Sequence, residues 1–368
     1  MSKFLDEGQH LAYATYKKGE TDPVVWAVRN ISLPKNIPWN FEERMWQIPI
    51  LEDEHPQIVV KKSVQRGLTT IILAKLLQYL NYNSRTAMYT FPRRDDITDF
   101  VGNTLNPIIQ NSPHLKSIIF ETDSVRLKRF RAEHKGQSIE SFFHLMEASV
   151  EPRMIPVDIL INDEIDRSDQ NYLEIFRGRL EASQDPRHYL FSTPTLPGFG
   201  IDKAYENTTQ NEWTVRCGHC SEYQNLTWEA NFTDRPKPMY VCVRCERELS
   251  ADVIVTGKWQ PLYPDREIQG YHVTHMMTPI SKPPELMWAE FNLGGTRKNF
   301  YNLKLGAAYS SASGSLPKEI LKAKMFDSGH GEETIPMSPG SYYLGVDQAN
   351  DVHVLIARIE GKHNKIVF

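Results

Sequence analysis

The stretch IVVKKSVQRGLTT, residues 58–70, carries the clearest structural signal in this chain. Its apolar start predicts a buried strand, Gly67 a tight turn, and the apolar run after Thr69 an amphipathic helix. This order is typical of a phosphate-binding loop with the pattern G-x-x-x-x-G-K-[ST], in which a lysine directly follows the second glycine. Leu68 stands in that lysine position, so the cation is either lost or placed elsewhere in the loop.

A lysine is present at the other end of the same loop, where Lys62 aligns with the first glycine of the pattern. A loop that curls around a phosphate brings its first and seventh positions together, so a flexible lysine at either position can reach the phosphates. Lys61 is the rival, but neighbouring strand residues point to opposite faces, and the alignment favours Lys62. A strand, a turn with one glycine and a helix also occur together in many proteins that bind no nucleotide, so this pattern alone is a weak signal. We expect the Thr69 hydroxyl on Mg²⁺, and an ATP site formed by Lys62, Ser63, Gln65, Arg66, Gly67, Leu68, Thr69 and Thr70.

Two further apolar strands end in polar residues. VDILIND (157–163) ends at Asp163 and is followed by Glu164, and HYLFSTP (188–194) carries Ser192 and Thr193. An aspartate in this position can hold Mg²⁺, and the adjacent glutamate can deprotonate the attacking water. The alternative for Asp163 and Glu164 is an acidic helix cap after a buried strand, and the alternative for Ser192 and Thr193 is a simple turn. The phosphate-binding loop, the strand ending in Asp163 and the strand ending in Ser192 occur in the order expected for an ATPase. The sequence therefore predicts an ATPase.

Composition limits the remaining possibilities. The chain has 368 residues, 24 % of them charged, and a net charge of −4, so its overall charge gives no sign of nucleic-acid binding. It contains no run of eighteen apolar residues and no signal peptide, and we expect a cytoplasmic protein that contacts no membrane. Strand and helix patterns alternate over residues 57–195, which predicts an α/β fold with a mainly parallel sheet and helices on both faces.

All four cysteines lie between residues 217 and 245, in the motifs CGHC and CVRC with twenty-one residues between them. This spacing predicts a structural Zn²⁺ site formed by four thiolates. His219 is a further possible ligand, but four thiolates already complete a tetrahedral shell. Four incidental buried thiols are the alternative. The predicted zinc ligands are Cys217, Cys220, Cys242 and Cys245.

The order of these motifs resembles the GpA-like large terminase subunits of tailed bacteriophages. The stretches that carry the resemblance span residues from about 26 to 351; they are VVKKSVQRGLTT, DILINDEIDR, FSTPTLPGFG, VRCGHCSEYQNLTW, GYHV, NLKLG and YYLGVD. The resemblance implies an ATPase of the ASCE type with Lys62 on phosphate, Asp163 on Mg²⁺ and Glu164 as catalytic base. It also implies that Ser192 and Thr193 couple hydrolysis to DNA movement, and that Asp347 is the first metal ligand of an RNase H-like nuclease.

From the resemblance we further expect a ring of subunits around double-stranded DNA, with the portal protein and the small terminase subunit as partners. We expect an N-terminal arm (1–50), an ATPase core (51–210), a zinc ribbon (211–262), a return to the core with a linker (263–335), and the start of the nuclease domain (336–368). Two strands are expected in the last part, with only Asp347 and Asp351 as candidate nuclease ligands. We therefore expect a truncated nuclease that does not cut DNA.

Ring ATPases often receive an arginine from a neighbouring subunit. Arg179 is our candidate for this catalytic role, with Arg177 and Arg66 as alternatives, and ordinary surface charges explain any one of them equally well. Two other functions stay open at this point. One is a helicase-like ATPase that remodels nucleic acid and carries a zinc ribbon. The other is a zinc-ribbon DNA-binding scaffold whose ATPase loop is inactive.

Overall fold

The computed structural model describes residues 22–120, 124–134, 136–151, 154–293 and 297–310, and three strands within residues 342–366. The chain divides into two compact units, Met1–Ala312 and Ser313–Phe368, and each is described by itself. No helix among the described residues is long and apolar enough to cross a membrane.

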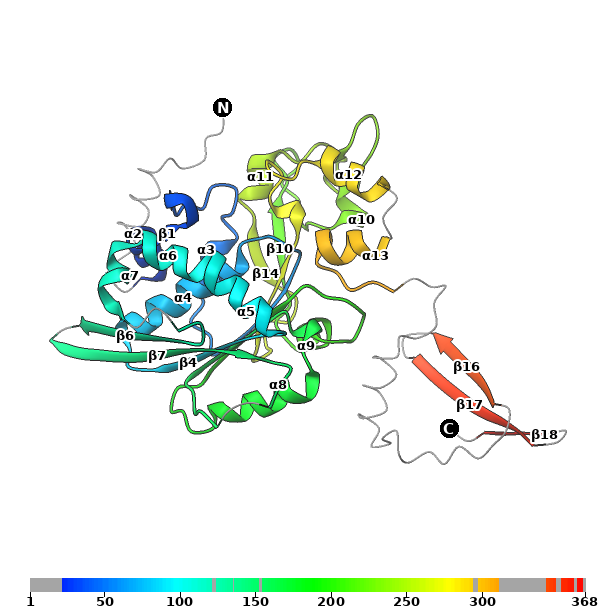
Figure 1. Ribbon diagram of the computed structural model, residues 1–368. Coiled ribbons are helices and arrows are strands. Elements are labelled where there is room, and N and C mark those ends of the chain that lie inside the picture. The colour runs from blue at the N-terminus through cyan, green and yellow to red at the C-terminus, as the bar shows by residue number, and fades with distance from the viewer. Residues whose placement is uncertain are drawn as a thin grey trace. The chain divides into compact units, whose positions relative to one another are not determined.

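The first unit is built on one large, mostly parallel sheet (Figure 1). In spatial order its strands are β11 (Tyr223–Asn225), β10 (Asn211–Arg216), β15 (Gln269–Val273), β3 (Gln57–Lys62), β9 (Arg187–Ser192), β8 (Ile159–Asp163), β4 (Thr86–Phe91), β7 (Gln137–Glu147), β6 (Leu127–His134) and β5 (Ile119–Phe120). All pairings from β10 to β7 are parallel, whereas β11, β6 and β5 are antiparallel to their neighbours. The predicted α/β fold with a mainly parallel sheet is confirmed.

Helices cover both faces of this sheet, with α4 and α5 on one face and α8 and α9 on the other (Figure 1). The helices are α2 (Pro23–Asn30), α3 (Gln47–Glu52), α4 (Leu68–Tyr82), α5 (Arg94–Phe100), α6 (Asn106–Asn111), α7 (Pro113–Ile118), α8 (Gln170–Arg177), α9 (Ile201–Glu206), α10 (Trp228–Asn231), α11 (Ala251–Val255), α12 (Pro284–Asn292) and α13 (Arg297–Phe300). Alternate residues of β3 are buried on opposite faces: Ile58 and Val60 join the α4 core, and Val59 packs with Ile201 of α9. Burial on both faces explains why this strand reads as a continuous apolar run.

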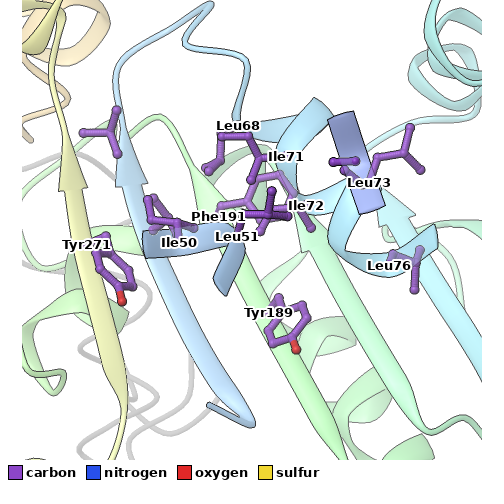
Figure 2. Packing of buried hydrophobic residues seen from close by; sticks show 14 of the residues in the cluster. Ile50, Leu51, Leu68, Ile71, Ile72, Leu73, Leu76, Tyr189, Phe191 and Tyr271 are labelled. Carbon is purple, nitrogen blue, oxygen red and sulfur yellow. The ribbon is translucent and has the colours of Figure 1, made fainter. Parts of the chain in front are cut away.

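The core under α4 includes the residue that replaces the expected lysine. Leu68 is 2 % exposed and belongs to the same cluster as Ile71, Ile72 and Phe191 (Figure 2). Full burial of a leucine side chain is worth about 1.5–3 kcal/mol. Leu68 therefore anchors the start of α4 in the core.

The described part of the first fifty residues also packs into the core. Trp26 of α2 is 1 % exposed, and Trp46, directly before α3, is fully buried. These side chains join the main hydrophobic cluster. Residues 22–52, most of which we expected to form an arm, thus contribute two of the largest core side chains.

The cysteine-bearing segment begins and ends within the main sheet. β10 pairs with β14 (Lys258–Pro261), and a small two-stranded sheet of β12 (Phe232–Thr233) and β13 (Met239–Tyr240) lies between them in sequence. The chain then returns through β15, which inserts between β10 and β3. The first residues after the cysteine-bearing segment therefore lie directly beside the strand that leads into the phosphate loop.

The second unit contains a three-stranded antiparallel sheet of β16 (Tyr342–Gln348), β17 (Val352–Glu360) and β18 (His363–Ile366). We expected two strands here, and β18 is the additional one. Asp347 lies in β16, opposite His353 of β17. Asp351, the second candidate nuclease ligand, lies outside the described residues.

Candidate active site

The phosphate loop connects β3 to α4 and has the backbone of a tight turn. Gln65 (φ 55°) and Gly67 (φ 76°) are both left-handed, and Gly67 is the N-cap of α4. A Cβ on Gly67 would lie 3.3 Å from Nε2 of Gln47, so glycine is favoured by space as well as by φ. The first peptide N–H groups of α4 lack carbonyl partners within the helix and can bind an anion.

Segments distant in sequence hold this loop in place. The Ser63 amide donates to the Val273 carbonyl at 2.8 Å, and the Val64 amide donates to the Leu303 carbonyl at 3.0 Å. Nε2 of His275 lies 3.0 Å from the Val64 carbonyl oxygen. The loop conformation is thus fixed by the part of the chain that follows the cysteines.

Lys62 and Lys61 point to opposite faces of β3. Nζ of Lys62 lies 2.6 Å from Oε1 of Glu164, on the phosphate-loop side, and Lys62 is only 6 % exposed. Nζ of Lys61 pairs with Oδ1 of Asp202 at 3.2 Å on the α9 side. Burial lowers the pKa of Lys62, but the Glu164 and Asp163 carboxylates outweigh it, so the pKa is raised and the side chain is charged.

Asp163, at the end of β8, accepts two hydrogen bonds on one oxygen. Thr69 Oγ1 lies 3.2 Å from Oδ2, and the Tyr89 hydroxyl donates to the same atom at 3.0 Å. The other oxygen, Oδ1, is buried and has no hydrogen-bond partner among the described residues. Burial raises the pKa of Asp163 to about 7, with Lys62 opposing this shift. A buried, unpartnered carboxylate oxygen beside a threonine hydroxyl is a donor set that suits a divalent cation.

Glu164 adopts a backbone conformation that is unusual for a glutamate. Its φ of 51° and ψ of 48° are left-handed, which costs roughly 1–3 kcal/mol for a residue with a side chain. This turn directs its carboxylate toward Lys62 and toward the end of β9. Oε2 of Glu164 lies 3.5 Å from both the Ser192 hydroxyl and the Thr193 amide. The structure therefore places Lys62, Asp163, Glu164, Ser192 and Thr193 together at the carboxyl ends of β3, β8 and β9.

The other predicted loop residues have different environments. Ser63 is fully buried, and its hydroxyl has no hydrogen-bond partner among the described residues. Gln65 is exposed at the tip of the loop. Thr69 and Thr70 line an open cleft beside Asp163 and Glu164, whose other lining residues include Asp96 and Arg167.

The three candidate arginines do not lie together at this site. Arg66 is buried and donates to Thr278 Oγ1 at 2.5 Å and to the Val64 carbonyl, so its guanidinium is held within the chain. Arg177 is exposed on α8 and contacts Glu174 at 3.8 Å. The carbonyl of Arg179 accepts a hydrogen bond from the Val157 amide, which precedes β8. The Arg179 backbone thus lies at the end of β8 opposite to Asp163.

The four cysteines form one compact group. Their Sγ atoms all lie within 4.8 Å of one another, with Cys217 and Cys245 at 3.7 Å and Cys220 and Cys242 at 3.6 Å. Backbone amides of His219 and Arg244 each lie 3.4 Å from a cysteine sulfur. The His219 ring itself lies 3.5 Å from an Arg247 nitrogen.

Sequence reasoning missed several residues around the site. Tyr89 of β4 binds Asp163, Gln47 of α3 donates to the Arg66 carbonyl at 2.9 Å, and His275 contacts the Val64 carbonyl. A tyrosine in an apolar strand and a glutamine in the apolar stretch WQIPIL were visible signals, because buried polar groups need partners. Those partners are more than fifteen residues away in sequence, and the local pattern does not name them.

Several solved structures of phage large terminases are similar to this chain at low identity. The large terminase of the thermophilic bacteriophage D6E, which has also been solved with ADP and with ATP-gamma-S, shares 12 % identity, with a TM-score of 0.45 and coverage of 86 % of this chain and 65 % of its own. The HK97 large terminase shares 12 %, with a TM-score of 0.46 and coverage of 93 % and 65 %. The Thermus phage P74-26 large terminase ATPase domain shares 12 %, with a TM-score of 0.46 and coverage of 72 % and 92 %.

The chain spans about two thirds of the length of the D6E and HK97 proteins. No curated protein matches it at a significant level. Residues 49–259, more than half of the chain, match the family described as "Phage terminase large subunit gpA, ATPase domain". These residues include the phosphate loop, the Asp163–Glu164 pair and all four cysteines. The chain belongs to the phage terminase large subunit family and contains its ATPase domain.

Proposed function

We propose that this chain hydrolyses ATP at the carboxyl ends of β3, β8 and β9 and uses the energy to move double-stranded viral DNA into a procapsid. The observation that carries the proposal is the contact between Lys62 and Glu164 at 2.6 Å, beside Asp163 and Thr69. It brings a phosphate-binding cation, a candidate base and a candidate metal ligand to one place. Family membership supports ATP hydrolysis in DNA packaging.

Nucleotide binding is assigned to the start of α4. The amides of Leu68, Thr69 and Thr70 face the phosphates, and the left-handed Gly67 allows the backbone to approach them. Lys62, buried and charged, supplies the cation from the first position of the loop. When bound, Mg²⁺ would neutralise phosphate charge. Thr69 and Asp163 would hold it, because Asp163 Oδ1 is buried with no partner among the described residues.

The Lys62–Glu164 ion pair gives the site a way to respond to ATP. Without nucleotide, the ammonium of Lys62 and the carboxylate of Glu164 neutralise each other. Phosphates arriving at the loop compete for Lys62, which releases Glu164 to orient a water and accept its proton during attack on the γ-phosphate. The Ser192 hydroxyl and the Thr193 amide, 3.5 Å from Oε2, lie where they can sense this change.

The test is Glu164→Gln, which preserves shape but removes the base. We expect steady-state hydrolysis to fall by about 10²–10⁴-fold, while affinity for ATP stays within a few-fold of the parent chain. The matched control is Glu174→Gln, the same change on exposed α8, which should leave hydrolysis unchanged. Hydrolysis by Glu164→Gln at the parental rate would contradict the proposed role of Glu164.

We propose that Cys217, Cys220, Cys242 and Cys245 bind one structural Zn²⁺ in a zinc ribbon. Four thiolates at tetrahedral corners around zinc lie about 3.8 Å apart. The Cys220–Cys242 and Cys217–Cys245 sulfur pairs, at 3.6 and 3.7 Å, match this spacing. The amide hydrogen bonds to two of the sulfurs suit thiolates. All four positions are filled by sulfur, so the chemistry there is structural.

We propose further that the strands β16–β18 belong to an RNase H-like nuclease fold in which Asp347 binds metal. Their antiparallel order and the aspartate in β16 support this. Duplex DNA, the portal protein and the small terminase subunit are the proposed partners, and a ring of subunits in the host cytoplasm, docked on the procapsid, is the proposed assembly. DNA-stimulated hydrolysis that rises further with a cognate portal would support this assignment.

A further inference from the structure

The loop between β9 and α9, residues 193–200, is held by side chains from three segments that border the proposed nucleotide site. We call this segment the coupling loop, since it starts at Thr193, the predicted coupling residue. The groups that hold it are the side chains of Asp166, Asp202 and Asn302. Asp166 follows Glu164 by two residues, Asp202 pairs with Lys61 beside Lys62, and Asn302 precedes Leu303, whose carbonyl binds the phosphate loop.

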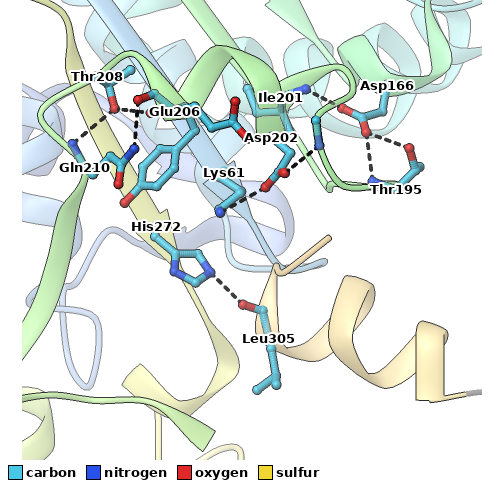
Figure 3. A network of polar contacts seen from close by, with 12 residues as sticks. Lys61, Asp166, Thr195, Ile201, Asp202, Glu206, Thr208, Gln210, His272 and Leu305 are labelled. Carbon is cyan, nitrogen blue, oxygen red and sulfur yellow. Dashed lines mark hydrogen bonds and ion pairs between the residues drawn. The ribbon is translucent and has the colours of Figure 1, made fainter. Parts of the chain in front are cut away.

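Asp166 lies two residues after Glu164 and holds both ends of the loop. Its Oδ2 accepts hydrogen bonds from the amide and the hydroxyl of Thr195, both at 2.8 Å, and its Oδ1 accepts one from the Ile201 amide at 2.8 Å (Figure 3). A Cβ on Gly200 would lie 2.4 Å from Oδ1, so the loop closes tightly over this carboxylate. Any displacement of the segment after Glu164 is therefore passed to both ends of the loop.

Asp202 connects the loop to the strand before the phosphate loop. It accepts a hydrogen bond from the Gly198 amide at 3.0 Å and pairs with Lys61 at 3.2 Å (Figure 3). Lys61 is the neighbour of Lys62 in β3. Lys61, the first of the two adjacent lysines in β3, is therefore paired with Asp202 and does not point toward the proposed phosphate position.

Asn302 connects the loop to the phosphate loop itself. Its Nδ2 donates to the Thr195 carbonyl at 2.9 Å, and the next carbonyl along, that of Leu303, accepts from the Val64 amide. Both residues lie in η6 (Tyr301–Leu305), a short π-helical segment. Thr195 is therefore held from one side through Asp166 and from the other through η6.

We propose that Asp166 is a positioning residue that makes the coupling loop follow the state of Glu164 and the phosphate loop. This inference rests on the proposed ATPase function. The strained backbone of Glu164 can relax when its carboxylate leaves Lys62, and Asp166, two residues on, transmits that movement to Thr195 and Ile201. Asp166 needs no contact with ATP for this role.

The test compares hydrogen exchange of the peptide covering 193–201 with ADP and with ATP-γ-S at pH 8. Burial raises the pKa of Asp166 to about 6, against the hydrogen bonds from Ile201 and Thr195, so the carboxylate is charged at that pH. In the parent chain we expect exchange to differ roughly fivefold or more between the two nucleotides, about the protection that one hydrogen bond gives. Asp166→Asn can keep the bond to Ile201 or those to Thr195, but not all three, and should abolish the difference.

Controls separate this role from general damage to the fold. Asp166→Asn should bind ATP-γ-S within about threefold of the parent, because Asp166 does not contact nucleotide. Asp169→Asn is the matched change on the same segment: Asp169 is exposed and caps α8, which asparagine does equally well, so it should retain the nucleotide-dependent difference. Thr195→Val, which removes only the hydroxyl contact, should reduce the difference in part and gives a milder second variant.

The possible outcomes distinguish failure of the proposed ATPase function from failure of the proposed role of Asp166. A parent chain that binds neither ADP nor ATP-γ-S overturns the proposed function and this inference with it. If the parent binds and hydrolyses ATP but its loop exchange is the same with both nucleotides, the inference alone is overturned. A difference that persists undiminished in Asp166→Asn, or in Thr195→Val where Asp166→Asn does not fold, also overturns it.

Discussion

Lys61 and Lys62 are adjacent in sequence but belong to different parts of the structure. Lys62 contacts Glu164 at the phosphate loop, whereas Lys61 lies over the Tyr205 ring, 4.5 Å from its centroid, and pairs with Asp202. We predict that Lys62→Ala abolishes ATP hydrolysis and weakens ATP binding about tenfold, because a phosphate contact worth 1.4 kcal/mol corresponds to tenfold in affinity. Lys61→Ala should bind ATP within about threefold of the parent. Fluorescent-nucleotide titration and steady-state hydrolysis measure both effects.

Loss of hydrolysis in Lys61→Ala together with normal hydrolysis in Lys62→Ala would contradict this assignment. Leu68, which fills the usual lysine position, is buried in the core and offers no charge. Its truncation should therefore act through packing.

His188 of β9 gives the fold a sensitivity to acid. Its Nε2 lies 2.8 Å from Asn162 Oδ1, and burial, with Arg177 nearby, lowers its pKa to about 4. A histidine whose pKa is lowered in the folded chain stabilises the fold fully above the pKa of the unfolded chain, near 6.5. This stabilisation is lost as the pH falls toward 4. Between pH 7.5 and 5.0 we predict a loss of about 2 kcal/mol from this group. His188→Gln does not titrate and keeps an amide donor for Asn162.

Urea unfolding of the parent and of His188→Gln at both pH values tests this prediction. Other groups titrate in both proteins, so only the difference between their losses reports on His188. We expect the parent to lose about 2 kcal/mol more than the variant over this range. Equal losses would show that His188 titrates normally in the folded chain.

At the scale of elements, an aromatic cluster joins the cysteine-bearing segment to the helices that precede η6. Trp228 of α10 stacks on Phe232 at 3.9 Å and packs edge-on against Phe300 of α13 at 4.8 Å, and Phe232 stacks on Trp288 of α12 at 5.3 Å. Since η6 follows α13 and binds the loop between β3 and α4 through Leu303, the cysteine cluster and the proposed nucleotide site share a structural support.

We predict one Zn²⁺ per chain, and we expect its removal to unfold the cysteine-bearing segment, because formation of such a site is coupled to local folding. Affinity for ATP should then fall several-fold through the loss of support for η6. Elemental analysis, tryptophan fluorescence and nucleotide titration before and after chelation measure these effects. A folded, fully reduced chain with a zinc content near zero would contradict the prediction.

At the scale of the whole molecule, the position of Arg179 bears on assembly. Its carbonyl binds the Val157 amide, two residues before β8, and the four steps from Ile159 to Asp163 alone span roughly 13 Å at 3.3 Å per residue. An arginine at that distance does not serve its own site, so a catalytic role requires a neighbouring subunit. We predict that mixing Arg179→Ala subunits with Lys62→Ala subunits restores part of the hydrolysis lost by each alone.

The matched control mixes Lys62→Ala with Glu164→Gln. Both substitutions remove a residue of the same site, so every subunit in this mixture has a defective site. No recovery of hydrolysis is expected. Steady-state hydrolysis in assembled rings measures both mixtures. Absence of recovery with Arg179→Ala would remove Arg179 from consideration and leave Arg177, which is exposed on α8, as the next candidate.

Local sequence patterns were enough to predict the main strands and helices and the chemical groups that they carry. The strand QIVVKK, the helix that follows Gly67 and the strand ending at Asp163 were predicted within one or two residues, because hydrophobic periodicity and turn residues act over short distances in the chain. The parallel order also followed, since alternating strands and helices cover both sheet faces. The carboxyl ends of parallel strands lie at one edge, so Lys62, Asp163 and Ser192 could be expected to meet there.

The surroundings of those groups depend instead on how the chain packs in three dimensions. The insertion of β15 beside β3, the hydroxyl of Tyr89 on Asp163 and the burial of Arg66 against Thr278 leave no local signature. The Arg66 contact, for example, joins residues 212 positions apart in the chain. Such contacts depend on which polar groups remain unpaired after the core has packed, and each then takes the partner that the fold brings within hydrogen-bond distance. Local sequence patterns specify strands and helices, whereas these pairings are set by the three-dimensional packing of the whole unit.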